Sequence, residues 1–141
     1  MFIGVSSKIV HCLKAVIELA RHYSSGTPVK LEKITQFQNI SGKFLLQLMG
    51  QLKNAGLVKS LRGMDGGYLL ARPPTDISLY DVIKSVNDEK ISGEEAHDQL
   101  DTLIAEIHSS ANIMLEKYYR QLTLANLLEQ LMQKEEIIYN I

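Results

Sequence analysis

The chain has 141 residues, 45% of them hydrophobic, and a formal net charge of −1. This length allows one domain, or one small domain with an arm, and the apolar share is enough for a core. No run approaches the ~18 consecutive apolar residues that a membrane helix needs, and the N-terminal residues lack the order of a secretory signal. The single cysteine, Cys12, excludes an intramolecular disulfide framework. We therefore expect a cytoplasmic protein with no membrane partner.

The small net charge hides an uneven distribution. Residues 1–75 carry ten Lys/Arg and three Asp/Glu, a balance of +7, whereas residues 76–141 carry five Lys/Arg and thirteen Asp/Glu, a balance of −8. A basic half can bind a polyanion, and an acidic half is repelled from it. The alternative is that charges fall unevenly on solvated surface, so the motifs have to decide.

Helical spacing of apolar residues predicts three helices in the N-terminal part. The first covers about 6–23, and a short second one covers about 31–37. Residues 38–40 form a tight turn, after which Ser41 can cap a third helix over about 42–54. That third helix is amphipathic. Its inward positions are Leu45, Leu48, Met49 and Leu52, and its outward positions are Lys43, Leu46, Gln47, Gly50, Gln51 and Lys53.

A β-hairpin is predicted directly after these helices. Residues 57–62 can form a strand, the glycine-rich stretch 63–67 a turn, and residues 68–71 the return strand, which two prolines end. A further helix is expected over about 78–87. The fold class is therefore mainly α with a small β-hairpin wing, and residues 1–87 form a winged helix-turn-helix domain.

The C-terminal part is predicted to be a helical dimerisation segment over 98–141, joined by an acidic loop over 88–97. A long helix covers about 98–120, and a last helix begins near Thr123. The long helix carries an apolar stripe of about six turns, roughly 34 Å, which a two-fold partner can bury; folding back on its own domain is the alternative. The stripe consists of Leu100, Leu103, Ile104, Ile107, Ala111, Met114, Leu115 and Tyr118.

Two short helices around a tight turn, followed by a wing, suit double-stranded DNA. The second helix of such a unit fits the major groove, and its N-terminal residues meet the base edges. Lys43 can reach a phosphate or a guanine, Gln47 can contact adenine at two points, and Phe44 offers apolar surface to a thymine methyl. Arg62, beside Gly63 at the hairpin tip, can enter a narrow minor groove. Phosphates can be held by Lys8, Lys59 and Arg72.

Each of these residues also has a plainer interpretation. Ser41 is a helix cap in any case, Phe44 can belong to the core, and Lys43 and Gln47 can be solvated surface. A glycine-rich turn is most often only a turn. The order of the elements and the charge distribution are what favour DNA binding.

Three motif runs closely resemble the Rrf2 family of bacterial winged-helix regulators. The longest run is Arg62-Gly63-x-x-Gly66-Gly67-Tyr68-x-Leu70-Ala71-Arg72-x-Pro74-x-x-Ile77-x-Leu79-x-Asp81-Val82-Ile83. The others are Ile40-Ser41-x-x-Phe44-Leu45-x-Gln47-Leu48 and Leu52-Lys53-x-Ala55-Gly56-Leu57-Val58, with Ser7-Lys8 near the start and Leu122-Thr123-Leu124 before the last helix. The resemblance covers residues 1–87 well and the rest more loosely.

The resemblance implies a homodimer that binds a partly palindromic operator, usually as a repressor, with the long helix crossing its mate. It places Ser41, Lys43, Phe44 and Gln47 at groove-reading positions and Arg62 at the minor-groove position. Cluster-type members often carry a glutamate where Leu46 stands, so their operator does not carry over. The predicted DNA-binding set is Ser7, Lys8, Ser41, Lys43, Phe44, Gln47, Lys59, Arg62, Gly63 and Arg72.

This sequence departs from the family in its sensor. Cluster-binding members hold iron–sulfur with three cysteines in the loop before the long helix, and residues 88–97 contain none. We therefore predict no cofactor and no metal, although His97, His108 and nearby carboxylates suit zinc or nickel in type. A redox switch at Cys12 is not expected, because a buried thiol is usually inert.

Two other functions compete with a cluster-free repressor. In one, the winged domain and the acidic C-terminal half bind a protein partner, as in a family member controlled by an enzyme of cysteine synthesis. In the other, the chain is an enzyme, but no phosphate loop, nucleophile motif or catalytic carboxylate pair is present. We predict a DNA-binding regulator that is not an enzyme, with the choice between a protein and a small-molecule effector left open.

Overall fold

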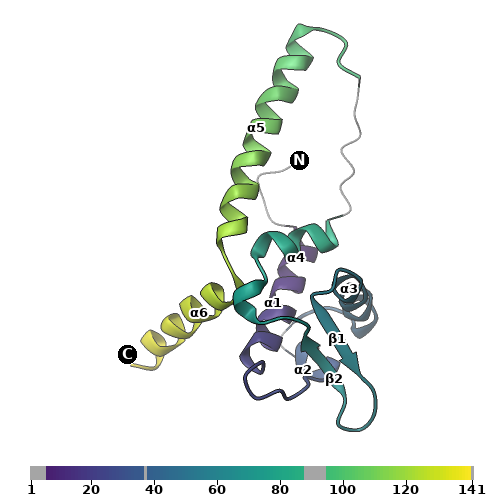
Figure 1. Cartoon of the computed structure of the whole chain (residues 1–141), viewed down its shortest axis with the longest axis vertical. Coiled ribbons are helices and arrows are strands. Elements are labelled where there is room, and N and C mark those ends of the chain that lie inside the picture. The colour runs from purple at the N-terminus through teal and green to yellow at the C-terminus, as the bar shows by residue number, and fades with distance from the viewer. Residues whose placement is uncertain (1–5, 37, 88–94, 141) are drawn as a thin grey trace.

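The computed structural model describes residues 6–36, 38–87 and 95–140 (Figure 1). A compact body at the N-terminal end carries two helices that project from it. The elements are α1 (Ser7–Arg21), α2 (Leu31–Thr35), α3 (Gly42–Asn54), β1 (Val58–Leu61), β2 (Gly67–Leu70), the 3₁₀ turn η1 (Pro74–Asp76), α4 (Leu79–Val86), α5 (Gln99–Gln121) and α6 (Leu124–Tyr139).

Side-chain caps fix where five of the helices begin. The Ser41 hydroxyl accepts a hydrogen bond from the Phe44 N–H at 3.1 Å, and the same kind of cap satisfies an N–H in the first turn of four other helices. The capping residues are Ser6, Ser41, Ser78, Asp98 and Thr123. These caps are why the sequence pattern places the helix starts to within a residue or two.

The hairpin is held against the body by a short extra bridge. Strands β1 and β2 pair antiparallel, and Val29 makes an isolated bridge to Tyr68, with N–H···O distances of 2.9 and 2.8 Å. Gly67 permits this approach. Its φ is 150°, and a Cβ there would lie 2.6 Å from the Val29 carbonyl oxygen. The hairpin therefore has a fixed position relative to α1 and α2.

The core lies between α1, α3, α4 and the hairpin. Its fully buried side chains include Val16, Leu45, Leu48 and Val82. The first residue of α6 also belongs to it, because Leu124 is 0% exposed and its N–H donates to the Ile77 carbonyl at 2.9 Å. The start of α6 is thus part of the winged domain's packing.

Helix α5 rises away from this body, with only its C-terminal end beside α4 (Figure 1). There the Arg120 guanidinium lies 4.0 Å from the Tyr80 ring centroid and donates to Glu116, which lowers the pKa of that carboxyl. No residue of α5 is buried. The helix therefore does not fold back on its own domain.

The helix and strand predictions are confirmed, with differences at the ends. α1 ends at Arg21, two residues earlier than expected, and α2 ends at Thr35; residue 37 lies outside the described residues. β1 is two residues shorter than predicted, and β2 has the predicted length but begins and ends one residue earlier. Residues 88–94 of the predicted acidic loop also lie outside the described part. The bridge at Val29 and the turn η1 were not predicted, because both depend on contacts that a local pattern does not show.

Candidate nucleic-acid interface

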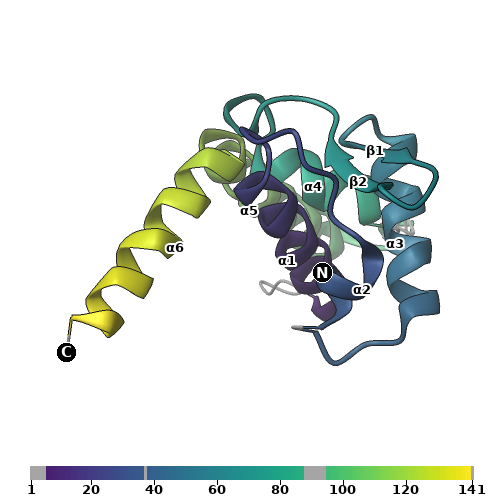
Figure 2. The ribbon, with the colours of Figure 1, turned by 90° about the horizontal axis from the view of Figure 1, so that it is seen from below.

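The outward face of α3 is open to solvent. Its inward leucines are 0–1% exposed, whereas Lys43, Leu46 and Gln47 are exposed, Leu46 to 53%. Figure 2 shows α3 and the hairpin on one flank of the body and α6 on the opposite flank. The face that sequence analysis assigned to DNA is therefore not covered by another described element.

The N-terminal end of α3, predicted to read the DNA bases, also has a structural role. The Ser41 hydroxyl is used as the helix cap, and Phe44 is half-buried and packs against the core. Phe44 thus holds the helix on the body and leaves part of its ring accessible. Lys43 and Gln47 extend outward on either side of it, so the plainer interpretation applies to Ser41 and partly to Phe44.

The hairpin tip lies beyond the end of β1. Arg62 directly follows that strand and is exposed, and Gly63 has a φ of 104°, which favours glycine. The Gly66 N–H donates to the Gly63 carbonyl at 3.0 Å and closes the turn. Met64, at the tip, is 89% exposed. The turn holds Arg62 on a short hairpin, and in the described part of the chain its guanidinium makes no hydrogen bond or ion pair.

Basic side chains occur around α3 and the wing. Lys59 is exposed on β1, and Lys53 of α3 donates to the Ser60 hydroxyl at 3.0 Å, which ties the helix to the wing. Ser7 and Lys8 lie at the start of α1. Arg72 lies 4.0 Å from the Asp81 carboxylate, so a phosphate at Arg72 would compete with that acid.

The predicted dimerisation stripe forms an uncovered apolar face in one chain. Six of its eight residues are at least half exposed, Ala111 is exposed and Leu115 is intermediate. Ile113, which the stripe did not include, is 64% exposed. The exposed fractions of the six are Leu100 61%, Leu103 51%, Ile104 56%, Ile107 61%, Met114 72% and Tyr118 58%.

Cys12 is buried in the middle of α1 and is 0% exposed. Burial raises the pKa of its thiol from 9.0 to about 11, and the charge of Lys8 lowers it by a smaller amount. The thiolate is the reactive form, so this thiol is poorly placed to bind a metal or to react.

We expect Cys12 to resist alkylation in the folded protein. Iodoacetamide at about pH 8 should leave it unmodified and should label it fully after unfolding in guanidinium. Because folding raises the pKa, the stabilisation linked to this group is present below pH 9.0 and is lost as the pH rises toward 11. Labelling of the native protein at the rate of a free thiol would contradict the expectation.

Comparison with known proteins assigns this arrangement to a family. The model of the Rrf2 family, described as an iron-dependent transcriptional regulator, matches residues 5–130. The chain belongs to the Rrf2 family. It is 36% identical over 121 residues to a Neisseria meningitidis serogroup A protein named as an HTH-type transcriptional regulator, which covers 82% of this chain and 81% of that one.

Solved structures of family members share its fold. The structure of CymR, titled the global cysteine regulator of B. subtilis, superposes with a TM-score of 0.76 at 32% identity, covering 92% of this chain and 98% of that one. T. potens IscR gives a TM-score of 0.75 at 34% identity, covering 91% and 88%. The winged-helix fold and the class of DNA-binding transcription regulator follow from this membership.

The iron in the family's description does not fit this Rrf2 member. A cluster of the family type needs several thiolates, and the chain has one cysteine, which is buried in α1. Within the described residues no group of three or more His, Cys, Asp or Glu could hold a metal, and no helix is long and apolar enough to cross a membrane. Residues 88–94, with Glu94, lie outside that description.

Proposed function

We propose that two copies of this chain bind one partly palindromic operator and repress transcription from it. The observation that carries the proposal is that α3 and the wing lie on the same flank of the body (Figure 2), with Lys43 and Gln47 of α3 and Arg62 of the wing all exposed. A helix and a hairpin tip on one flank suit the major groove and the adjacent minor groove. Such a regulator works in the cytoplasm and has no catalytic role.

The residues divide into base-reading and phosphate-binding groups. In the proposed complex, Lys43, Phe44 and Gln47 meet base edges, and Arg62 with Gly63 enters the minor groove. Ser7, Lys8, Lys59 and Arg72 contact phosphates, and Ser41, whose hydroxyl caps α3, lies with the groove-reading residues. The +7 balance of residues 1–75 supports this assignment, because phosphate neutralisation supplies most of the non-specific affinity.

The winged helix-turn-helix unit of each copy, α1 to α4 with the hairpin, is called its reading head. Dimerisation through α5 sets the spacing of the two reading heads. The apolar face of α5 is long and uncovered in one chain, and exposed patches of that kind mark interfaces. A two-fold partner that presents the same face would bury both. The two α3 helices would then meet half-sites about one helical turn of DNA, or a multiple of it, apart.

Selection from a random library of DNA duplexes tests the proposal. The purified protein should retain duplexes that share one motif with two-fold symmetry. Affinity for a selected duplex should fall steeply with salt, with a slope of about −0.9 per neutralised phosphate in a double-logarithmic plot. Retained duplexes with no common motif, or binding that salt does not change, would contradict sequence-specific recognition.

Arg62→Ala should weaken binding to the selected duplex by about 1–3 kcal/mol, if the arginine reads the groove. The fold should not change, because Arg62 is exposed and precedes the glycine turn. Fluorescence anisotropy at fixed salt measures the loss. Lys134→Ala on α6, also exposed, is the matched control and should leave the affinity unchanged. Equal affinity of Arg62→Ala and the parent protein would remove the minor-groove role.

A further inference from the structure

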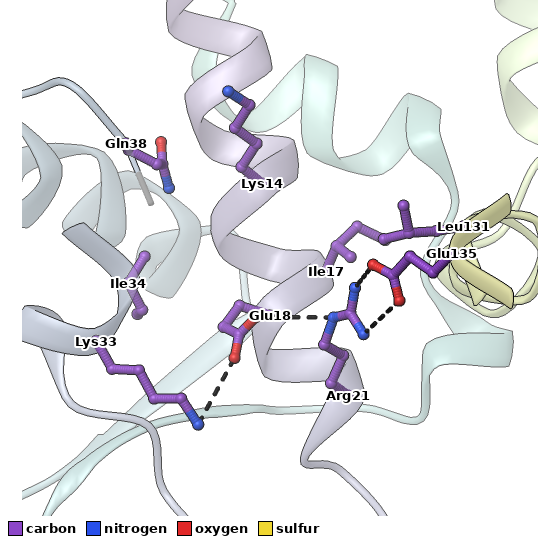
Figure 3. Close-up of a pocket in the computed structure, with 9 residues that line it drawn as sticks. All are labelled: Lys14, Ile17, Glu18, Arg21, Lys33, Ile34, Gln38, Leu131 and Glu135. Carbon is purple, nitrogen blue, oxygen red and sulfur yellow. Dashed lines mark hydrogen bonds and ion pairs between the residues drawn. The ribbon is translucent and has the colours of Figure 1, made fainter. Parts of the chain in front are cut away.

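A hollow lies between the helix-turn-helix and the last helix (Figure 3), and no residue of α3 or the hairpin lines it. Its volume is about 550 Å³, within the range of small-molecule sites. One face of α1 forms its centre, α2 and the following turn form one side, and α6 forms the other. The lining consists of Lys14, Ile17, Glu18, Arg21, Lys33, Ile34, Gln38, Leu131 and Glu135.

Both carboxylates in the hollow already have cationic partners. Glu135 receives two hydrogen bonds from the Arg21 guanidinium, at 2.5 and 3.4 Å, which join α6 to α1. Glu18 lies 3.2 Å from the His22 ring, 3.7 Å from Arg21 and 3.8 Å from Lys33. No carboxylate is therefore left for the ammonium group of a ligand, which argues against a cation or an amino-acid zwitterion.

One cation that lines the hollow, Lys14, has no anionic partner among the described residues. Three cations line it against two carboxylates, and among the described residues Lys14 has no recorded hydrogen bond or ion pair. Figure 3 shows Lys14 at the end of the hollow away from the pair between Arg21 and Glu135. Gln38 lines the hollow from the turn after α2. Its amide oxygen is 2.7 Å from the His11 ring nitrogen Nδ1, so its amide nitrogen is the group that can donate to a ligand oxygen.

The floor between these polar groups is aliphatic. Ile17, Ile34 and Leu131 line it from α1, α2 and α6, and Ile34 is 2% exposed. An aliphatic group placed there leaves water and contacts three elements at once. A ligand that fits has a hydrophobic body and one negative end.

We propose that this hollow binds a small organic carboxylate with one branched aliphatic group and no free ammonium, its carboxylate held by Lys14 and Gln38. The ligand bridges α1 and α2, which belong to the reading head, and α6, which continues from the dimerisation helix. It is thereby placed to couple effector binding to the angle between the reading head and α6. Only this coupling rests on the proposed DNA function; binding itself does not.

The test uses the full chain, without DNA, and two probes that differ only in charge. N-acetyl-leucine carries the carboxylate, and N-acetyl-leucinamide replaces it with a neutral amide. Isoleucine methyl groups are labelled and followed by NMR. We expect the carboxylate to shift Ile17 and Ile34 saturably, with a Kd of about 1 mM, and to leave the α5 residue Ile113 unmoved.

Lys14→Gln should weaken binding of the carboxylate about tenfold, the loss expected for one hydrogen bond to a charged group. Lys117→Gln on α5, equally exposed, is the control and should not change it. The proposal fails if the carboxylate does not bind, if the amide binds as tightly, or if the two variants behave alike. Because no DNA is present, failure here and failure of operator binding are separate results.

Discussion

Two aspartates on the apolar face of α5, Ile104→Asp with Ile107→Asp, should convert the proposed dimer into a monomer. Both isoleucines are more than half exposed in one chain, at 56% and 61%, and the proposed two-fold contact buries them. A buried carboxylate without a partner costs several kcal/mol, and the symmetry places four in one interface. The dimer dissociation constant should rise at least about a thousandfold, a change of about 4 kcal/mol.

Sedimentation velocity checks the change in mass, and anisotropy with the selected duplex checks its effect on DNA binding. A monomer meets only one half-site, so the affinity should fall toward that of a single reading head. Ser109→Asp is the matched control. It adds one negative charge per chain, half of what the double variant adds, on the opposite side of α5, where Ser109 is exposed. A double variant that stays dimeric, or a control that dissociates equally, would remove α5 as the interface.

The second large effect is expected at Leu45 of α3, and its neighbour Leu46 serves as the contrast. Leu45→Ala should destabilise the protein by about 2–5 kcal/mol, because Leu45 is 0% exposed and its loss leaves a cavity under the reading helix. Leu46→Ala should change stability by less than about 0.5 kcal/mol, because Leu46 is 53% exposed. Urea unfolding followed by circular dichroism measures both.

The same pair of variants separates stability from recognition. Leu46→Ala keeps the fold, so any change in its affinity for the selected duplex reports a contact with DNA. Leu45→Ala should bind DNA only to the extent that it is folded. If Leu46→Ala destabilised the protein as much as Leu45→Ala, the inward and outward faces of α3 would be wrongly assigned.

The elements of the reading head could be predicted from sequence because their signals are local. Leu45, Leu48 and Leu52 repeat at helical spacing, and Ser41 supplies the cap that begins α3. The outward position of Lys43 and Gln47 follows from the same periodicity. Their contacts with DNA remain predictions, since periodicity shows which face is open and not what that face meets.

Contacts between distant segments could not be predicted in this way. Nothing near Val29 signals its bridge to Tyr68, and nothing near Leu124 signals that it completes the core of the winged domain. The ion pair between Arg21 and Glu135 joins residues 114 positions apart. The hollow between α1 and α6 exists only because of such contacts, so no local pattern in the sequence indicates it.

Because α5 projects from the reading head, the structure also predicts how mutant alleles behave in a cell that carries a normal copy of the gene. A copy altered only at Arg62 keeps its pairing helix intact, so in a cell with both forms it would associate with normal copies. Each mixed pair would have one working head and would release its operator more readily. One defective allele should therefore lower repression by the normal one, whereas an allele altered at Ile104 and Ile107 should be recessive.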